Sequence, residues 1–208
     1  MTRNIDELNN LKKRPVDPKT YFGEMDLTKK QKDDRIDFTQ KVNEILDLVL
    51  VLLLTMSDKY FEEYDYIRDL LETQLLETIG DVSVLDGYLI GYVTDFTQNF
   101  IDVTRKNIED EWFTSPDRAL FNAENSANDV FNYVEYMDAL MAGKTQKQWI
   151  TKKDKRVRTT HRIIDGKTIG IDELFNVGGV LMRFPKDTAL AGERDVEIIN
   201  CRCSARYF

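Results

Sequence analysis

The stretch DVFNYVEYMDALMAGKTQKQWI, residues 129–150, contains the point at which the chain changes character. Apolar residues in its first half recur every three or four positions, as in an amphipathic helix, and Gly143 is a suitable C-cap. Its last three residues, Gln148-Trp149-Ile150, are typical of a β-strand. We therefore predict an α+β fold, with a mainly helical N-terminal region followed by a small C-terminal unit of short antiparallel strands.

The helical spacing continues upstream of this stretch. Four helices are predicted before Gly143, and Ser115-Pro116-Asp117 is a typical start for the last of them. The most apolar segment, Leu48–Leu54, is too short for a membrane span, which needs about 20 residues. We expect it to lie in a fully buried core helix, with an interface between subunits as the alternative. The predicted helices cover residues 35–56, 57–79, 84–108 and 116–143.

Charge divides the chain at the same place. The chain has 208 residues and a formal net charge of −8. Residues 144–208 carry fourteen basic and eight acidic side chains, whereas residues 1–143 carry fifteen and twenty-nine, so the two parts have net charges of +6 and −14. This split predicts different partners for them. We expect a flexible polar arm at residues 1–34, an acidic helical region at 35–143 and a basic α+β unit at 144–208.

Short segments of β-type residues, separated by turn signals, follow Gly143. Asp165-Gly166 lies between two of them and is a typical type I′ hairpin turn. The unit after Gly143 has about 65 residues, which is near the lower limit for a core without a cross-link. We therefore expect it to pack on the last predicted helix or to bind a metal. The predicted strands are 148–150, 162–164, 180–184 and 196–199.

The single histidine and both cysteines of the chain fall in this basic tail, at His161, Cys201 and Cys203. A Cys-x-Cys pair is too tight for an ordinary disulfide, so a reducing compartment is the simpler assumption. Thiolates and imidazole are the ligands that zinc prefers, and Asp154 could supply a fourth. The alternative is two buried cysteines and a hydrogen-bonded histidine without metal. Because the spacing matches no recognised zinc finger, both interpretations stay open.

Basic residues surround His161. They could bind DNA phosphates, which need positive charge but no particular sequence, or the acidic surface of a protein partner. The alternative is a solvated face, or internal pairing of the arginines with Asp154, Asp165 or Glu197. The candidate binding residues are Lys152, Lys153, Lys155, Arg156, Arg158, Arg162 and Arg202.

Several short motifs also follow one another along the tail. In order, they are Gln148-Trp149-Ile150-Thr151, Asp154-x-Arg156-Val157-Arg158-x-x-His161, Asp165-Gly166, Phe175, Pro185 and Asn200-Cys201-Arg202-Cys203. This ordered set resembles that of the Mu F-like head-morphogenesis family of tailed phages. Upstream, Ala123–Ser126 is similar to a Thr-Glu helix of that family, so the resemblance covers about residues 118–203.

The resemblance implies a minor capsid protein of the virion head, assembled in the host cytoplasm. Its implied partners are the portal, other head proteins and DNA during packaging or ejection. It also implies a metal or structural cluster at His161, Cys201 and Cys203, to which Asp154 could add a fourth ligand. The motif residues that would be structural are Trp149, Asp165, Gly166, Pro185 and Asn200.

No recognised catalytic or nucleotide-binding motif occurs in the sequence, so we expect a protein that is not an enzyme. One alternative is a phage-borne nuclease or toxin-like enzyme. His161 would then be the general base, and Arg156 or Arg158 would stabilise phosphate charge. A zinc-stabilised module for protein interaction is the other alternative.

Overall fold

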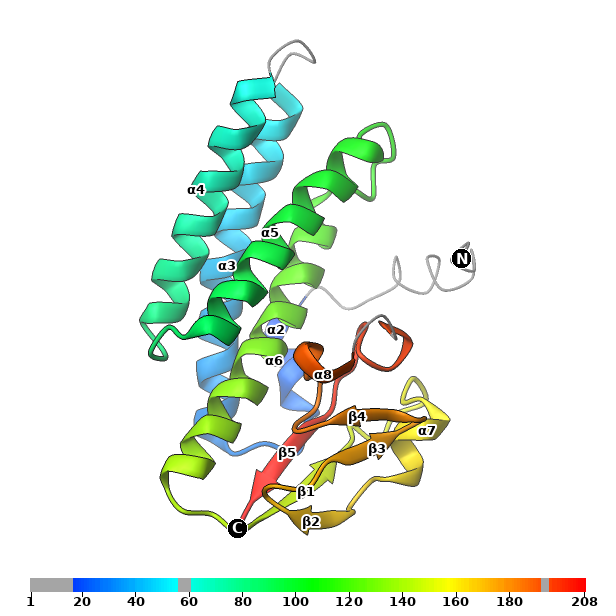
Figure 1. The fold of residues 1–208 in the computed structure, drawn as a ribbon. Coiled ribbons are helices and arrows are strands. Elements are labelled where there is room, and N and C mark those ends of the chain that lie inside the picture. The colour runs from blue at the N-terminus through cyan, green and yellow to red at the C-terminus, as the bar shows by residue number, and fades with distance from the viewer. Residues whose placement is uncertain (1–16, 56–60, 192–194) are drawn as a thin grey trace. The chain divides into compact units, whose positions relative to one another are not determined.

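The computed structural model describes residues 17–55, 61–191 and 195–208. Long helices come first along the chain and short antiparallel strands follow (Figure 1). This order confirms the predicted α+β fold class with a mainly helical N-terminal region. None of the helices in the described ranges is apolar over a length that would cross a membrane.

The chain divides into two compact units, each of which takes residues from two separate parts of the sequence. We call residues 17–21, 37–55 and 61–124 the helical unit. We call residues 22–36, 125–191 and 195–208 the mixed unit, because it contains all the described strands.

Four long helices carry the apolar spacing that the sequence displays, and each corresponds to a predicted helix. They are α3 (Lys29–Thr55), α4 (Phe61–Gly80), α5 (Gly87–Lys106) and α6 (Pro116–Met141). Within the helical unit, α4 packs against α5. Pro116 occupies the first turn of α6, as expected, and the predicted helix start at Ser57 lies outside the described residues.

The apolar run Leu48–Leu54 of α3 is amphipathic, which corrects the expectation of a fully buried helix. Val49 and Leu53 are completely buried or nearly so, whereas Leu48, Val51 and Leu54 are 52%, 57% and 52% exposed. Residues three or four positions apart share one side of a helix, so α3 buries one face and leaves an apolar stripe on the other. We call Leu48, Val51 and Leu54 the α3 stripe.

The mixed unit contains five short strands in two antiparallel sheets. They are β1 (Gln146–Ile150), β2 (Thr168–Gly170), β3 (Phe175–Val177), β4 (Val180–Met182) and β5 (Ser204–Tyr207). β1 lies between β2 and β5 in one sheet, and β3 pairs with β4 in the other. The β3–β4 turn is Gly178-Gly179, whose positive φ angles of 60° and 90° suit glycine.

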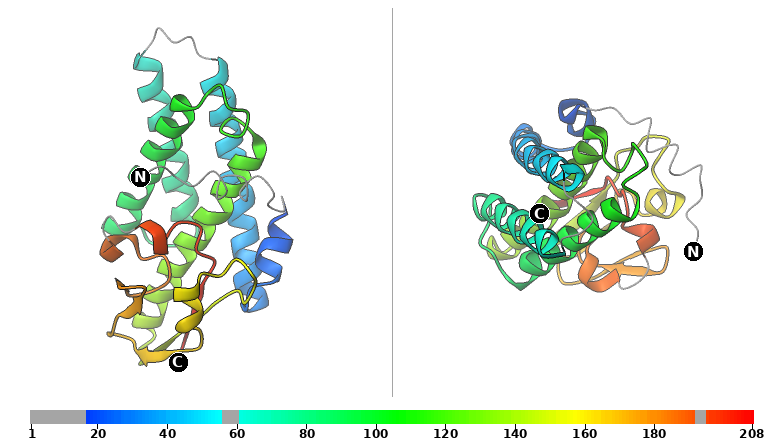
Figure 2. Two further views of the ribbon diagram at one scale, coloured as in Figure 1. Left: turned by 90° about the vertical axis from the view of Figure 1, so that its right-hand side faces the viewer. Right: turned by 90° about the horizontal axis from the view of Figure 1, so that it is seen from above.

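The second half of α6 runs alongside the segment that leads into β5, as the views in Figures 1 and 2 agree. The side-chain amides of Asn128 and Asn132 on α6 donate hydrogen bonds to the carbonyl of Cys203, at 3.2 and 3.1 Å. Trp149 on β1 and Phe175 on β3 are completely buried in the adjoining core. This packing is the contact with the last predicted helix that we expected for a tail of this size.

The predicted strand at 162–164 is wrong, because these residues belong to the end of α7 (Thr159–Ile163) and the turn after it. His161 and Ile164, three positions apart, are buried, whereas Ile163 between them is 76% exposed. That is the burial pattern of a helical turn and not of a strand. As a result, Asp165-Gly166 does not close a hairpin onto residues 168–169, and β2 pairs with β1 instead.

The predicted strand at 196–199 is also wrong. Its residues lie in a short 3₁₀ helix, Asp195–Glu197, and in the turn that follows. Glu197 and Ile198 are buried side by side while Val196 is 65% exposed, so burial does not alternate as it would in a strand. The short helix α8 (Thr188–Ala191) separates this segment from β4, which ends at Met182 instead of residue 184.

The described part of the expected arm, residues 17–34, is mostly helical. It contains α2 (Pro18–Gly23) and the first turns of α3. Phe22 and Met25 are buried, and Glu24 pairs with Lys152 within the mixed unit at 3.1 Å. These apolar and charged contacts stabilise a segment whose polar composition suggested an arm, and residues 1–16 lie outside the described ranges.

Candidate functional site

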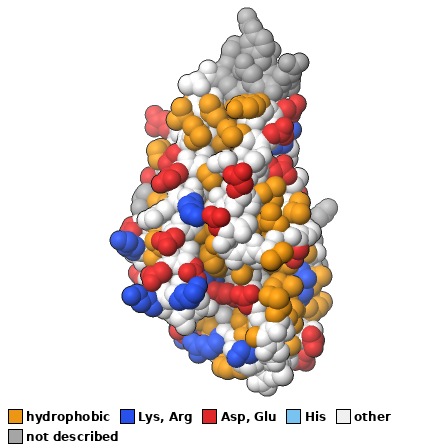
Figure 3. Space-filling model, turned by 90° about the vertical axis from the view of Figure 1, so that its left-hand side faces the viewer, with side chains coloured by type: hydrophobic (Ala, Val, Ile, Leu, Met, Phe, Trp, Pro, Cys, Tyr) orange, Lys and Arg blue, Asp and Glu red, His pale blue; other side chains and the backbone are white. Residues whose placement is uncertain are grey.

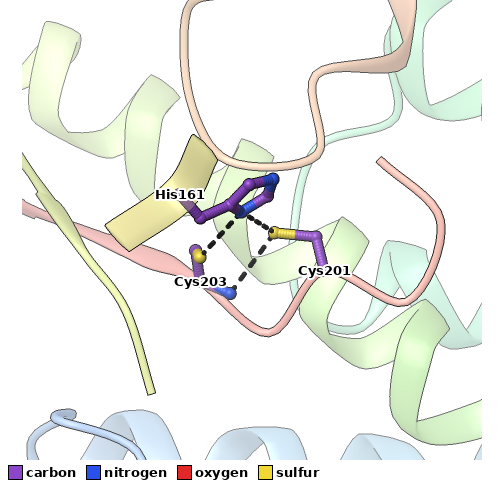
Figure 4. Close-up of side chains that lie close together, drawn as sticks. All are labelled: His161, Cys201 and Cys203. Atoms are coloured by element: carbon purple, nitrogen blue, oxygen red, sulfur yellow. Dashed lines mark hydrogen bonds between the residues drawn. The ribbon is translucent and has the colours of Figure 1, made fainter. Parts of the chain in front are cut away.

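His161, Cys201 and Cys203 come together in the core of the mixed unit (Figure 4). His161 lies on α7, and the two cysteines lie in the segment immediately before β5. Nδ1 of His161 is 3.3 Å from Sγ of Cys203 and 3.5 Å from Sγ of Cys201. All three side chains are buried, and both thiols are free. We call these three residues the Cys-His cluster.

Asn200 sets the backbone that presents the two cysteines. It has a positive φ of 56°, a left-handed conformation that asparagine tolerates better than most residues. Asn200 is the third residue of a turn over residues 198–201. A hydrogen bond from the backbone N–H of Cys201 to the carbonyl of Ile198, at 3.0 Å, closes this turn. The backbone N–H of Cys203 then points toward Sγ of Cys201, at 3.5 Å. The Asn-Cys-Arg-Cys order therefore has a local structural reason.

Trp149 forms one wall of the cluster. Its ring meets those of His161 and Phe175 edge to face, with centroids 5.7 and 5.1 Å apart. Such pairs contribute about 0.5–1.5 kcal/mol beyond the burial of their area. Because β1 is the central strand of its sheet, this wall is held on both sides by strand pairing.

The carboxylate of Glu197, which we considered as a partner for an arginine, contacts the far side of the imidazole instead. Oε2 of Glu197 is 3.0 Å from Nε2 of His161, and it accepts a second hydrogen bond from the hydroxyl of Thr160 at 2.8 Å. Glu197 is 36 positions from His161 and lies in a segment that we predicted as a strand. No sequence signal links the two residues.

The two cysteines have opposite pKa shifts. Burial raises the pKa of the Cys201 thiol, but hydrogen bonds with Cys203 and His161 outweigh burial and lower it well below its ordinary value. Burial and the neighbouring Cys201 raise the pKa of Cys203 well above its ordinary value. Burial lowers the pKa of His161, but the hydrogen bond and charge of Cys201 raise it on balance.

The geometry of the Cys-His cluster fits a metal ion. In a tetrahedral zinc site with Zn–S near 2.3 Å and Zn–N near 2.0 Å, the nitrogen and sulfur ligand atoms lie about 3.5 Å apart. The observed N···S distances are 3.3 and 3.5 Å, and all three ligand atoms lie within 4.8 Å of one another. Soft sulfur and imidazole donors also match the chemistry of zinc. The three side chains can therefore serve together as ligands of one metal ion.

Asp154, the residue that we considered as a fourth ligand, forms an ion pair with Arg202 instead. Its carboxylate forms a bidentate pair with the guanidinium of Arg202 and accepts the backbone N–H of Arg156 at 2.9 Å. Burial raises the pKa of Asp154, but the hydrogen bond and charge of Arg202 outweigh it and hold the pKa at about 2. The structure thus groups Asp154 with Arg202 and not with the Cys-His cluster.

The candidate basic residues divide into two groups. Arg202 pairs with Asp154, buried Lys152 pairs with Glu24, and Arg158 donates to the carbonyl of Ile199. The exposed group is Lys153, Lys155, Arg156 and Arg162, of which Arg156 lies 4.0 Å from Asp154. Internal pairing therefore neutralises part of the positive charge of these seven residues. The exposed group carries the positive charge that faces solvent.

The remaining motif residues support the loops of the mixed unit. The carboxylate of Asp165 accepts the backbone N–H of Thr151 at 2.8 Å, and the N–H of Gly166 donates to the carbonyl of Trp149 at 2.8 Å. Pro185 is buried and precedes Lys186, which has a positive φ of 70°. These contacts fix the end of β1 and the chain after β4.

For the alternative of an enzyme, the position of His161 is informative. It is only 2% exposed, and its two ring nitrogens face the cysteines and Glu197. A general base needs a nitrogen within reach of substrate. This arrangement suits a metal ligand or a structural histidine better than a base that acts on DNA.

The ordered tail motifs, among them the residues of the buried Cys-His cluster, resemble those of phage head proteins. Comparison with known families agrees, since the family described as Phage Mu protein F like protein matches residues 99–206, about half of the chain. The chain belongs to this family of phage head proteins.

One curated relative is similar over a short region. It is the NAD(+)--arginine ADP-ribosyltransferase EFV of Enterococcus faecalis (strain ATCC 700802 / V583), 36% identical over 59 residues. These residues are 28% of this chain and 11% of that protein, so the chain spans only a small part of its relative. No solved structure matches the chain.

Proposed function

We propose that this head protein is a minor component that binds another head protein, with the portal as the first candidate, through the α3 stripe. The observation that carries the proposal is an apolar stripe on a helix of the acidic part of the chain. Leu48, Val51 and Leu54 are each more than half exposed although α3 has a buried face of its own. Exposed apolar side chains that gather on one face are typical of protein interaction sites.

The surroundings of the stripe indicate the chemistry of the partner. Glu44 and Asp47 lie on α3 within a turn of Leu48. Figure 3 shows hydrophobic side chains among acidic ones on the upper part of one face. Like charges across an interface are unfavourable, whereas opposite charges steer association. A partner with an apolar ridge and basic flanks therefore fits better than a second copy of this acidic surface.

Incorporation into procapsids tests this proposal. The triple variant Leu48→Ser, Val51→Ser and Leu54→Ser should fold, because all three side chains are exposed, and its copy number per procapsid should fall at least tenfold. Ile90→Ser, which removes a 45% exposed side chain from α5, is the matched control and should be incorporated normally. Normal incorporation of the triple variant would contradict the proposal.

We also propose that the exposed basic group of the mixed unit contacts DNA phosphates. The group consists of Lys153, Lys155, Arg156 and Arg162, and phosphate contact needs no more than such positive charge. Each lost phosphate contact should reduce the slope of log K against log salt by about 0.9. The variant Lys153→Gln, Lys155→Gln, Arg162→Gln should therefore bind duplex DNA with a slope smaller by about 2–3.

A variant that removes two positive charges outside the group provides the control for DNA binding. Lys144→Gln with Lys167→Gln removes two exposed lysines outside the group and should leave the slope within about one unit of wild type. Equal loss of binding in both variants would mean that only net charge matters.

Finally, we propose that the metal of the Cys-His cluster is zinc and that it stabilises the mixed unit. The N···S distances support this, as does the small core of a unit with no disulfide. Protein purified without chelator should contain one zinc per chain by elemental analysis. Cys201→Ser should lose that zinc and unfold the mixed unit, because structural zinc supplies folding free energy. A zinc content well below one in the wild type would refute the metal.

A further inference from the structure

We infer that Glu197 is the outer carboxylate of the metal centre, which orients His161 so that Nδ1 faces the two cysteine sulfurs. This inference rests on the zinc site proposed above and adds a residue that does not itself touch the ion. Metal-binding histidines usually donate their second ring N–H to such a partner, which fixes the tautomer and raises the basicity of the ligand nitrogen.

The hydrogen bonds around the imidazole determine which nitrogen carries the proton. A carboxylate oxygen only accepts hydrogen bonds, so the contact of 3.0 Å to Glu197 requires a proton on Nε2. In the neutral ring that keeps this proton, Nδ1 carries a lone pair in place of the proton that it otherwise shares with Cys201, and this is the nitrogen 3.3 and 3.5 Å from the two sulfurs. The tautomer that Glu197 selects is thus the one that a metal at the cysteines needs.

Glu197 is itself held in place by two other segments. The hydroxyl of Thr160, on α7, donates to the same carboxylate oxygen at 2.8 Å. The β3–β4 turn passes so close that a Cβ added at Gly178 would lie 2.4 Å from Oε1 of Glu197. The side chain of Glu197 is 9% exposed. Its position is therefore set by α7, by the β3–β4 turn and by its own 3₁₀ helix.

Glu197 lies outside the ligand set. Among the described residues, only His161, Cys201 and Cys203 place ligand atoms within 4.8 Å of one another in this group. Glu197 contacts the opposite edge of the imidazole, at Nε2. Three protein ligands leave the fourth position of a tetrahedral zinc ion to a ligand from outside this set, such as water.

Zinc affinity of the full chain tests the role of Glu197. The dissociation constant is measured by competition with a chromophoric chelator for wild type, Glu197→Gln and Glu197→Ala. Loss of an outer partner typically weakens metal binding about 10- to 100-fold, so Glu197→Ala should fall in that range. The side-chain oxygen of Gln in Glu197→Gln can still accept a hydrogen bond from Nε2–H. The zinc affinity of this variant should therefore lie between those of Glu197→Ala and wild type. Glu173→Ala removes an equal charge that contacts Gly170 and should bind like wild type.

The absorption of the cobalt(II)-substituted proteins separates positioning from general destabilisation. Sulfur-to-cobalt charge-transfer bands should persist in Glu197→Ala because both cysteines are intact. The ligand-field bands should shift because the imidazole is no longer oriented. A variant that had merely lost stability would lose occupancy and keep the wild-type band positions.

A second pair of variants tests the space around the carboxylate. Gly178→Ala should push Glu197 away and weaken zinc binding in the same way as Glu197→Ala. Gly166→Ala introduces comparable backbone strain, at a φ of 76°, but a Cβ there would meet no atom within 4 Å. It should therefore keep wild-type zinc affinity.

The outcomes distinguish this inference from the zinc proposal. A wild-type protein that binds no zinc would overturn both. A wild-type protein that binds zinc, with Glu197→Ala unchanged in affinity and cobalt spectrum, would overturn the role of Glu197 alone.

Discussion

At the scale of single residues, Lys147 on β1 combines full burial with a charge. Its Nζ lies 5.1 Å from the ring centroid of Tyr136 and 5.5 Å from that of Phe175, and it has no hydrogen-bond partner among the described residues. Burial lowers the pKa of Lys147 from 10.5 to about 8. Two aromatic faces therefore replace the acceptors that a buried ammonium normally needs.

Stability should rise with pH through the alkaline range because of Lys147. Between pH 8 and 10.5 the unfolded chain holds this proton and the folded protein does not, so raising the pH favours folding. The full effect of such a pKa difference is at most about 3 kcal/mol. Lys147→Met should stabilise the protein at pH 7 by about 1–3 kcal/mol and remove this part of the pH dependence in urea unfolding.

Exposed Lys167 is the matched control for this prediction. Lys167→Met should leave both stability and its pH dependence unchanged within about 0.5 kcal/mol. A wild-type curve parallel to that of Lys147→Met from pH 7 to 11 would contradict the prediction.

Asp154→Asn distinguishes an ion pair from a metal ligand. The variant leaves Arg202, whose side chain is 8% exposed, without its charged partner. It should lower the free energy of unfolding by about 1–3 kcal/mol at pH 7. This range is below that of a fully buried pair because Asp154 is partly exposed and solvent screens its charge. Zinc content should stay at one per chain. Loss of zinc with unchanged stability would instead restore Asp154 as a ligand.

The pH dependence of the Asp154–Arg202 pair follows from the lowered pKa. The folded pKa of Asp154 is about 2 against 3.8 for the free side chain. The pair therefore contributes fully above pH 3.8 and loses its contribution as the pH falls toward 2. The difference in stability between wild type and Asp154→Asn should shrink over that interval.

At the scale of elements, Asp86 is the N-cap of α5. Its carboxylate accepts the backbone N–H groups of Tyr88 and Leu89 at 3.0 and 3.1 Å. Asp86→Ala should cost about 1 kcal/mol, measured as a lower urea midpoint with an unchanged m-value. Asp95→Ala removes an exposed carboxylate from the middle of α5 and should cost less than about 0.5 kcal/mol. Equal costs would show that charge, and not capping, explains the effect.

Long helices were predictable because their apolar spacing persists over many turns, as in α3 and α6. Short elements were not, since a three-residue apolar run fits either a strand or a helical turn. Ile163 and Ile164 suggested a strand, but the burial of His161 and Ile164 makes this segment the end of α7. The amphipathic nature of Leu48–Leu54 was also hidden, because every position of that run is apolar.

At the scale of the whole molecule, residue types alone predicted part of the candidate site. The rest depends on contacts between segments that are far apart in the sequence. His161, Cys201 and Cys203 could be grouped because the chain contains no other histidine or cysteine. Asp154 was misassigned because it is near His161 in sequence, whereas Arg202 binds it in space. Glu197 had no local pattern that would reveal its contact with His161.

The two tryptophans report on the two units separately, since Trp112 belongs to the helical unit and Trp149 to the mixed unit. In a Trp112→Phe variant, removal of zinc by a chelator should shift the emission of Trp149 to longer wavelength as the mixed unit loosens. The far-UV circular dichroism should keep most of its helical signal, because the Cys-His cluster lies in the mixed unit.

Wild-type protein gives the complementary measurement. Its emission should shift less, because Trp112 contributes an unchanged component. Complete loss of helical signal on chelation would mean that the two units unfold as one.

The composition of the mixed unit has a consequence for the order of events during translation. Residues 22–36 belong to the same unit as residues 125–208, and Asp26 pairs with Arg206 across 180 positions at 3.2 Å. Such non-local pairing slows folding because a long loop must close first. While the ribosome is still adding residues 125–208, only the helical unit can be complete. The surface of α3 is then exposed to partners before β5 exists to close the sheet.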